Sequence, residues 1–156
     1  APARDRSTLL MGRERNDVRC RPGTESGLGY PVRVLREGDF LYLHNFDPSR
    51  WPCANPELGL KDTDDGPTKT AVEALGETNR CWQLCFGKRP LAELYNLKTD
   101  ADCANNLAAD PAHRAQVEAM REKLFSRLRE QGDPRMEGKG DVFDNYPTSK
   151  PAAPAP

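Results

Sequence analysis

Alternating hydrophobic and polar positions predict a β-hairpin in the first third of the chain. In the stretch PVRVLREGDFLYLHNF, Val32 and Val34 alternate with a charged residue, and Phe40 and Tyr42 alternate with leucines. A short polar link containing Gly38 separates the two runs, as in tight hairpins. Because the second run is apolar on both faces, we expect a central strand with side chains packed on each side.

A helical period near the C-terminus predicts one long amphipathic helix. Its apolar stripe, spaced by three, four and four residues, consists of Val117, Met120, Leu124 and Leu128. Asp110 is a good N-cap, Pro111 suits the first helical position, and Gly132 ends the helix.

A proline-rich loop and a short helix lie between these two patterns. The loop spans residues 46–66, and its prolines exclude regular structure from most of it. Ordered loops of this length are usually functional or interfacial. A helix is predicted to start at Pro67, with Val72 and Leu75 on one face.

Two further short apolar stretches are strand candidates, CWQLCF (81–86) and ELYNL (93–97), with Pro90 between them. Residues 1–29 are predicted to be irregular, and the Pro/Ala-rich tail 148–156 to be disordered. Together these elements predict an α+β fold, a small antiparallel sheet of three or four strands packed on the long helix, with long irregular loops. That helix covers one sheet face, so the other face needs a different cover.

Composition narrows the class of protein. The chain has 156 residues, a net charge of −1, and 37% hydrophobic residues with 14 Pro and 12 Gly. This predicts a small core with long irregular segments, or a fragment whose apolar surface is covered by a partner. No basic excess points to nucleic acid, and no apolar run approaches the roughly 20 residues of a membrane span. The first residues lack the apolar stretch of a signal peptide, so any export signal of a parent protein is expected upstream.

The cysteines are odd in number and scattered: Cys20, Cys53, Cys81, Cys85 and Cys103. If Cys81 and Cys85 belong to a strand, they share one face about 13 Å apart, too far for a disulfide. Their spacing also differs from that of common zinc sites. We therefore expect buried free thiols rather than a metal or disulfide site.

Candidate catalytic and metal-binding residues are sparse. His44 and His113 are the only histidines, and neither has a motif-spaced Cys or Ser partner for a catalytic triad. For His44, at a strand end, a hydrogen-bonded structural role is favoured over a pocket role. The stretch DTDDG (62–66) is similar to the start of a calcium loop, but its Gly comes early and the twelfth position falls in a predicted helix. We expect no catalytic residue, metal site or cofactor in this chain.

The remaining candidate is an anion-binding site made of scattered cationic residues, Arg13, Arg15, Arg50 and Lys69, with Trp51. Bidentate arginines suit sulfate, phosphate or carboxylate. Spacing alone favours ordinary surface charges, and no Gly-rich phosphate cradle is present.

Taken in order, six stretches resemble the C-terminal subdomain of the type I sulfatases, above all the bacterial heparan N-sulfatase (sulfamidase) branch. They are MGRERND, GYPVRVLREGDFLYLHNFDPSRWP, DTDDGPTKT, FGKRPLAELYNLKTDADCANNLAADP, REQGDPR and GDVFDNYP, and they cover nearly all of residues 11–147. The ELYNL stretch with its following helix is typical of sulfatases as a class. HNFDPSRWP and GKRPLAELY narrow the resemblance to the sulfamidase-like branch.

The resemblance implies that this chain and the catalytic site belong to different domains of one enzyme. Catalysis in such enzymes belongs to a large N-terminal α/β domain of alkaline-phosphatase type, which carries a formylglycine in a C-x-[PA]-x-R motif and a calcium ion. No cysteine of this chain is followed by that motif. Residues 1–29 would then link from a missing N-terminal catalytic domain, and residues 30–147 would be the C-terminal subdomain. The parent enzyme would often be exported, for example to the periplasm.

The resemblance also implies a substrate, a sulfated saccharide such as a heparan-type glycan, and a set of substrate-binding residues. These are Arg13, Glu14, Arg15, Asn16, Arg50 and Lys69. Family members commonly read GRERH where this chain has Asn16, which keeps a hydrogen-bonding group but loses the titratable ring. The alternative is a stand-alone, non-catalytic binding module for sulfated or anionic glycans that uses the same arginines.

Overall fold

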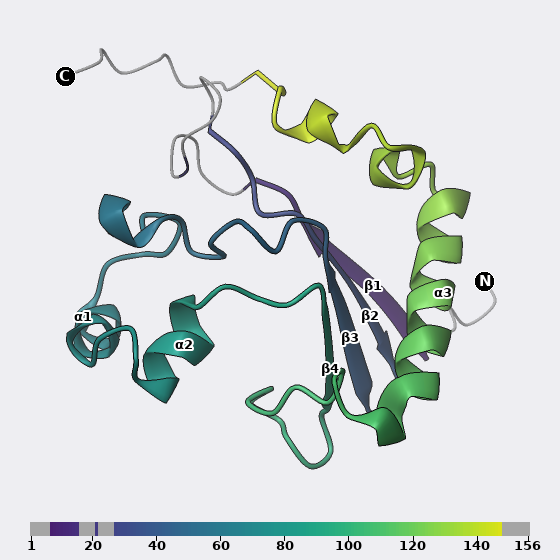
Figure 1. The fold of residues 1–156 in the computed structure, drawn as a ribbon. Helices are drawn as coiled ribbons and strands as arrows, with labels where there is room; N and C mark the ends of the chain where they lie inside the picture. Colours follow the sequence, from purple (N-terminus) through teal and green to yellow (C-terminus); the bar gives the residue numbers. More distant parts are fainter. Residues whose placement is uncertain (1–6, 16–20, 22–26, 148–156) are drawn as a thin grey trace, which may run out of the picture.

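The computed structural model of the protein describes residues 7–15, 21 and 27–147 (Figure 1). Within these residues the strands are β1 (Thr8–Arg13), β2 (Val32–Glu37), β3 (Phe40–Asn45) and β4 (Ala92–Asn96). The α-helices are α1 (Pro67–Ala74), α2 (Arg80–Phe86) and α3 (Arg114–Glu130). Short 3₁₀ helices are η1 (Pro56–Leu58), η2 (Pro111–His113), η3 (Pro134–Glu137) and η4 (Gly140–Phe143). The predicted α+β class is confirmed.

One antiparallel sheet has the strand order β1-β2-β3-β4, so chain neighbours are also spatial neighbours. The hairpin of β2 and β3 forms as predicted, with Leu35 opposite Tyr42. Gly38, in the two-residue link, has a φ of 55°, which a glycine adopts without steric cost. β3 lies inside the sheet, between β2 and β4, as its apolar sequence indicates.

The long helix also forms as predicted and covers one face of the sheet (Figure 1). Asp110 caps its start by accepting a hydrogen bond from the Ala112 N–H at 2.9 Å, although the first turn is the 3₁₀ helix η2. The main core lies between α3 and the sheet and contains Leu35, Tyr42, Leu94, Met120, Leu124 and Leu128. Val117 packs against it as well.

The expectation that residues 1–29 are irregular is wrong for β1. Thr8–Arg13 forms an edge strand that pairs along its whole length with β2. The sequence run Leu9, Leu10, Met11 shows no alternation, so the strand is specified by its pairing partner rather than by its own pattern. Leu10 packs on the core, whereas Leu9 and Met11 on the other face are 45% and 46% exposed.

The expectation of a strand at 81–86 is also wrong, because these residues form α2. The Asn79 side chain caps the helix by accepting a hydrogen bond from the Cys81 N–H at 2.8 Å. Trp82 and Phe86, four residues apart, then bury one helical face at 3% and 5% exposure. The four-residue spacing of the aromatic pair was the helical signal in this stretch.

A second, smaller core lies on the side of the sheet opposite α3, where Figure 1 shows α1 and α2. It consists of Leu60, Trp82 and Phe86, with Trp51, Cys53 and Val72 packed around them. The helix α1 begins at Pro67 as predicted, but Leu75 is 48% exposed rather than part of this core. The loop 46–66 and the helices α1 and α2 thus cover part of the sheet face that α3 leaves open, as expected (Figure 1).

No helix among the described residues is long and apolar enough to cross a membrane. The tail 148–156, predicted to be disordered, lies outside the part of the chain that the structure describes.

Candidate functional site

Most buried charges gather at the end of the sheet where β1 and β3 finish and β2 and β4 begin. Residues 133–146 return to this end after α3, and the loop 46–66 leaves from it (Figure 1). We call this region the charged corner. Its members are Arg13, Glu14, Arg15, Arg21, Arg33, Asp47, Arg50, Asp62, Asp133, Arg135 and Asp144.

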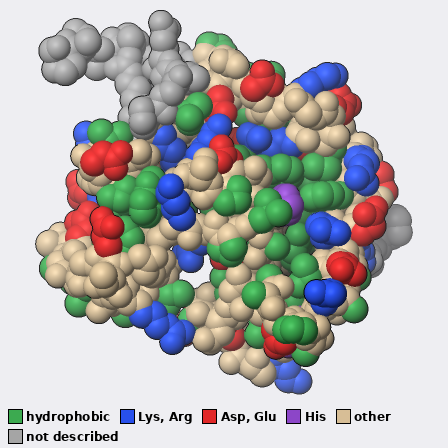
Figure 2. All heavy atoms as spheres, viewed as in Figure 1, with side chains coloured by type: hydrophobic (Ala, Val, Ile, Leu, Met, Phe, Trp, Pro, Cys, Tyr) green, Lys and Arg blue, Asp and Glu red, His purple; other side chains and the backbone are tan. Residues whose placement is uncertain are grey.

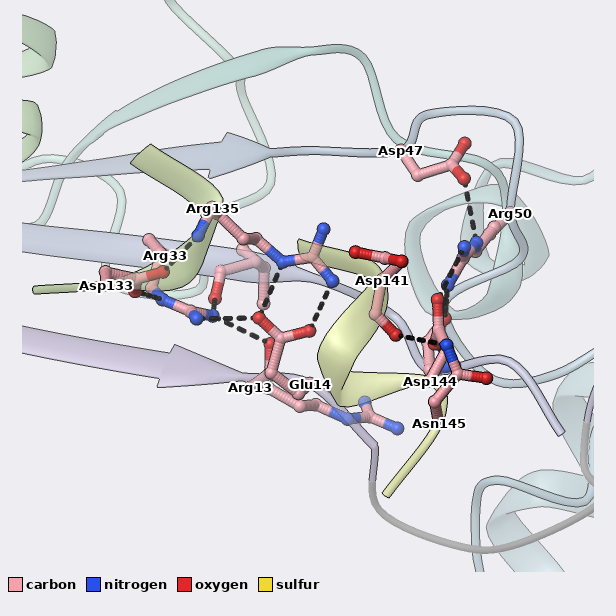
Figure 3. Close-up of polar contacts among 12 residues, drawn as sticks. Arg13, Glu14, Arg33, Asp47, Arg50, Asp133, Arg135, Asp141, Asp144 and Asn145 are labelled. Atoms are coloured by element: carbon pink, nitrogen blue, oxygen red, sulfur yellow. Dashed lines mark hydrogen bonds and ion pairs between the residues drawn. The ribbon is translucent and has the colours of Figure 1, made fainter. Parts of the chain in front are cut away.

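Glu14 connects β1 to the C-terminal segment. Its carboxylate lies 2.6 Å from Arg33 Nη2 and accepts hydrogen bonds from Arg135 Nε and Nη2 at 2.7 and 2.6 Å (Figure 3). Arg33 also donates from Nε to Asp133 at 2.7 Å. These four side chains are 9–16% exposed, so the surrounding low dielectric strengthens their contacts. Glu14 is therefore part of a buried network that binds residues 133–135 to the sheet.

Asp144 holds a second set of contacts in the charged corner. Its carboxylate accepts hydrogen bonds from Arg50 Nη1 and Nη2 and from the Gly29 N–H, the last at 2.8 Å. Burial raises the pKa of Asp144, but the hydrogen bonds from Arg50 and Gly29 outweigh it, so the pKa lies below its ordinary value. Gly29 is required here, because a Cβ would lie 2.5 Å from the Glu14 carbonyl oxygen. Arg50 also pairs with Asp47 at 2.7 Å.

Asp62, in the stretch that is similar to a calcium loop, binds two arginines instead. Its side chain is fully buried and pairs with Arg13 and, at 2.8 Å, with Arg21. Asp62 Oδ1 and Arg21 Nη1 are buried without a hydrogen-bond partner among the described residues. Among the described residues, two cations thus share this one carboxylate. The described chain contains no group of three His, Cys, Asp or Glu side chains placed to hold a metal.

A pocket of about 210 Å³ opens beside the charged corner, and among the described residues its lining carries three cations and no carboxylate. We call it the cationic pocket; it is lined by Arg21, Leu28, Ser49, Arg50, Trp51, Asn55 and Lys88. The Lys88 ammonium lies 5.0 Å from the centroid of the Trp51 ring. The Arg21 side chain, 2% exposed, is fixed by hydrogen bonds to the carbonyl oxygens of Trp51 and Pro52 at 2.8 and 2.7 Å.

Such a pocket is suited to an anionic group carried on a ring. Lys88 is exposed, so its ammonium can approach an anion. Arg21 Nη1, which has no hydrogen-bond partner among the described residues, is buried and adds positive charge to the lining rather than a direct contact. The Trp51 indole offers a flat apolar surface, and the side chains of Ser49 and Asn55 offer hydrogen-bonding groups. Arg50, in contrast, is paired with Asp47 and Asp144, so these two carboxylates compensate its charge.

The structure separates the predicted substrate-binding residues. Of the five that the structure describes, Arg50 alone lines the cationic pocket, while Arg13 lines another pocket on the sheet. Arg15 donates to the carbonyl oxygens of Asp144 and Tyr146 at 3.4 and 2.8 Å.

Lys69 lies apart from the charged corner. It donates to the carbonyl oxygens of Gly59 and Leu60 and pairs with Asp65, so it stabilises the loop before α1. Asn16, the sixth predicted residue, lies outside the described residues.

Sequence reasoning did not select Arg21 or Lys88. Arg21 follows a charged stretch in RCRPGT, and Lys88 belongs to the GKRP stretch before β4. Neither stands near Trp51 in the sequence. The packing of α2 against the loop brings Lys88 to Trp51, and hydrogen bonds to the Trp51 and Pro52 carbonyl oxygens hold Arg21 there. The available signal was the GKRP motif itself, which adds two cations directly after a helix.

The remaining candidates behave as structural residues. His44 is 8% exposed, and its ring lies edge-on to the rings of Phe46 and Phe125, with centroid distances of 4.7 and 4.8 Å. The Tyr42 hydroxyl lies 3.2 Å from His44 Nδ1. Burial, together with the nearby positive charge of Arg121, lowers the pKa of His44.

The described cysteines are free thiols as expected, but none is fully buried. Cys53 and Cys103 are partly buried, and burial raises the pKa of both thiols. Cys81 and Cys85 are exposed on α2, four residues apart on a helix rather than on a strand. Cys20 lies outside the described residues.

Comparison of the sequence with protein-family models and with curated proteins gives no match.

Proposed function

We propose that this chain is the C-terminal α+β domain of a sulfatase-type hydrolase that acts on sulfated sugars such as heparan-type glycans. The domain forms one wall of the substrate pocket and packs against an N-terminal catalytic domain. That catalytic domain would supply the formylglycine and the calcium ion, and this chain supplies no catalytic group. The order of the six sulfatase-like stretches, from MGRERND to GDVFDNYP, supports the proposal.

The observation that carries the substrate class is the cationic pocket. A sulfate ester or a sulfamate is a tetrahedral anion attached to a sugar ring. The pocket combines the ammonium of Lys88 and the buried guanidinium of Arg21 with the Trp51 ring, and the lining residues that the structure describes include no carboxylate. Charge-assisted hydrogen bonds to the anion and stacking of the sugar on the indole suit such a ligand.

A second observation supports packing against another domain. Leu9 and Met11 project from β1 on the face opposite α3, and each is close to half exposed. On the same face Val34 and Leu41 are partly exposed. An apolar surface on one face of a sheet is typical of a site that another domain covers.

Binding of heparin-derived oligosaccharide to the purified chain, measured by isothermal titration calorimetry, tests the substrate class. We expect binding that weakens with added salt and is lost with chemically desulfated oligosaccharide. Lys88→Gln should weaken binding about fivefold and Trp51→Leu at least as much. Lys98→Gln, which changes an equally exposed lysine at the far end of β4, is the matched control and should bind like the unchanged protein. Equal binding of sulfated and desulfated sugar contradicts the proposal.

The alternative is a stand-alone binding module for sulfated or anionic glycans, which the same pocket supports. The two functions differ in what accompanies the chain. A sulfatase domain should be recovered from its native source on a longer polypeptide, on which mass spectrometry detects a formylglycine peptide. A stand-alone module should be recovered without it. Hydrolysis of a chromogenic aryl sulfate by the purified 156-residue chain would contradict both.

A further inference from the structure

A second pocket, of about 300 Å³, lies on the sheet face opposite α3 and shares no lining residue with the cationic pocket. Figure 2 shows the surface hollowed in the region between α2 and the sheet. All four strands contribute to its floor, through Arg13, Val32, Leu43, Asn45, Glu93 and Tyr95. We call it the sheet-face pocket. The proposed function does not use it.

Glu93 is a buried carboxylate in the floor of this pocket. It is 4% exposed, and its two oxygens accept hydrogen bonds from Asn45 Nδ2 at 2.8 Å and from the Tyr95 hydroxyl at 2.5 Å. No ion pair joins Glu93 to a cation in the part of the chain that the structure describes. Buried carboxylates are usually paired, and an ionised carboxylate accepts about four hydrogen bonds, so Glu93 has capacity for a cationic donor.

Two arginines line the same pocket, and the described residues accept hydrogen bonds from only some of their N–H groups. Arg13 pairs through Nη2 with Asp62, but its Nε is buried without a hydrogen-bond partner among the described residues. Arg89 donates from Nη2 to the Leu84 carbonyl oxygen, which uses one of the five N–H groups of a guanidinium. Asp102 adds a second, exposed carboxylate to the lining, so the pocket presents acceptors for a cation as well as the arginine donors for an anion.

The charges are arranged around an apolar centre. Val32 and Leu43 from the sheet and Leu84 from α2 line the pocket between the polar groups. Tyr30 and Tyr95 add aromatic surface, and burial followed by the charge of Glu93 raises the pKa of Tyr30, so its hydroxyl stays neutral. A ligand with charge of both signs and a short aliphatic group matches this lining, and the volume suits a single small molecule.

We propose that the sheet-face pocket binds a small zwitterion with the size and charge pattern of an aliphatic amino acid. The ammonium group of the ligand donates to Glu93, its carboxylate accepts from Arg13 and Arg89, and its aliphatic group contacts Val32 and Leu43. Neither half of the ligand suffices alone, because each half forms charge-assisted hydrogen bonds with pocket groups of one sign only.

The test uses L-leucine as the probe and its two halves, 4-methylpentanoate and 3-methylbutylamine, as controls. Binding to the full chain is followed by the NMR signals of the Asn45 side-chain amide, which contacts Glu93. We expect L-leucine to shift these signals with a dissociation constant on the order of 1 mM. Each half should bind at least about tenfold more weakly. Equal shifts with either half, or none with L-leucine at concentrations far above this value, would overturn the proposal.

Two substitutions separate the contributions of the charges. Glu93→Gln keeps the size of the side chain, and the Tyr95 hydroxyl can turn to accept a hydrogen bond from the new amide. This substitution should weaken L-leucine binding about tenfold, because it removes the negative charge that faces the ligand's ammonium group. Arg89→Gln should weaken it similarly and leave 3-methylbutylamine unaffected. Glu118→Gln on the exposed face of α3 is the control and should change nothing. Unchanged L-leucine binding in both pocket variants would also overturn the proposal, and if a variant fails to fold, the comparison of L-leucine with its halves still decides.

Discussion

Arg50 binds the Asp144 carboxylate with both terminal nitrogens, Nη1 lying 3.1 Å from Oδ1 and Nη2 3.0 Å from Oδ2 (Figure 3). The two residues are 94 positions apart, so the pair ties the C-terminal segment to the loop after β3. Because the pKa of Asp144 is lowered in the folded protein, its contribution to stability is present above the ordinary value of 3.8. That contribution is lost as the pH falls through the lower folded pKa.

Replacing Arg50 by lysine should destabilise the protein by about 2 kcal/mol, because an ammonium group keeps the charge but cannot make the paired contact. Both side chains are less than 20% exposed, so solvent does not replace the lost hydrogen bond. Urea denaturation followed by circular dichroism measures the change. Arg127→Lys is the control, since Arg127 pairs with Glu130 on the surface and should change the free energy of unfolding by less than about 0.5 kcal/mol. A similar loss in both variants would argue against a special role for the Arg50–Asp144 pair.

Glu14→Gln should cost more, about 3 kcal/mol, because one carboxylate neutralises both Arg33 and Arg135 in a buried setting. Because Arg33 keeps its ion pair with Asp133, we expect the Glu14→Gln protein to remain folded. A double-mutant cycle of Glu14→Gln with Arg135→Gln, measured by urea denaturation, should give a coupling energy above about 1 kcal/mol. Additive effects of the two substitutions would contradict the network. Glu137→Gln, at an exposed pair with Lys139, should leave the unfolding midpoint unchanged.

Periodic apolar patterns allowed much of the fold to be predicted from sequence. The hairpin of β2 and β3 and the helix α3 bury side chains at the spacing of their own secondary structure, as Met120, Leu124 and Leu128 do. The strand β4 is predicted from its apolar run instead, and it buries three consecutive residues, 93–95. The edge strand β1 could not be predicted this way, because its conformation depends on pairing with β2.

The charged corner was less predictable. The partners of Arg13, Glu14 and Arg50 are Asp62, Arg135 and Asp144, which lie 49, 121 and 94 positions away. Charge and spacing along one sequence identify candidate arginines, but which of them is neutralised depends on tertiary contacts. Arg50 is the one predicted residue in the described part of the chain that lines the cationic pocket, and its role in substrate binding stays a prediction.

The helix α2 offers a direct test of why the stretch 81–86 is not a strand. Asn79→Ala removes the cap on the Cys81 N–H and should cost about 1 kcal/mol of stability. Trp82→Ala removes a side chain that is 3% exposed and should cost about 3–5 kcal/mol in urea denaturation. Cys81→Ala, on the exposed face of the same helix, is the control and should be near neutral. If Asn79→Ala has no effect, the burial of the aromatic face alone determines the helix.

The stability of the sheet core should depend on pH through His44. Burial lowers the pKa of this histidine below its ordinary 6.5, so the unfolded chain takes up a proton at a higher pH than the folded chain does. Stability is therefore fully present above pH 6.5, falls as the pH drops below it, and stops falling below the lower folded pKa. Thermal melts between pH 7.5 and about pH 5 measure this fall.

His44→Leu should abolish the fall in melting temperature, since a leucine in the space between Phe46 and Phe125 takes up no proton. His113→Gln should retain it, because His113 lies in η2 beside Asp110, where its ring is partly exposed. If the pH dependence disappears in His113→Gln but persists in His44→Leu, His113 rather than His44 causes it, and the prediction is wrong. Because the Tyr42 hydroxyl contacts His44 Nδ1, Tyr42→Phe should shift the melting temperature at every pH and leave the slope of its fall in place.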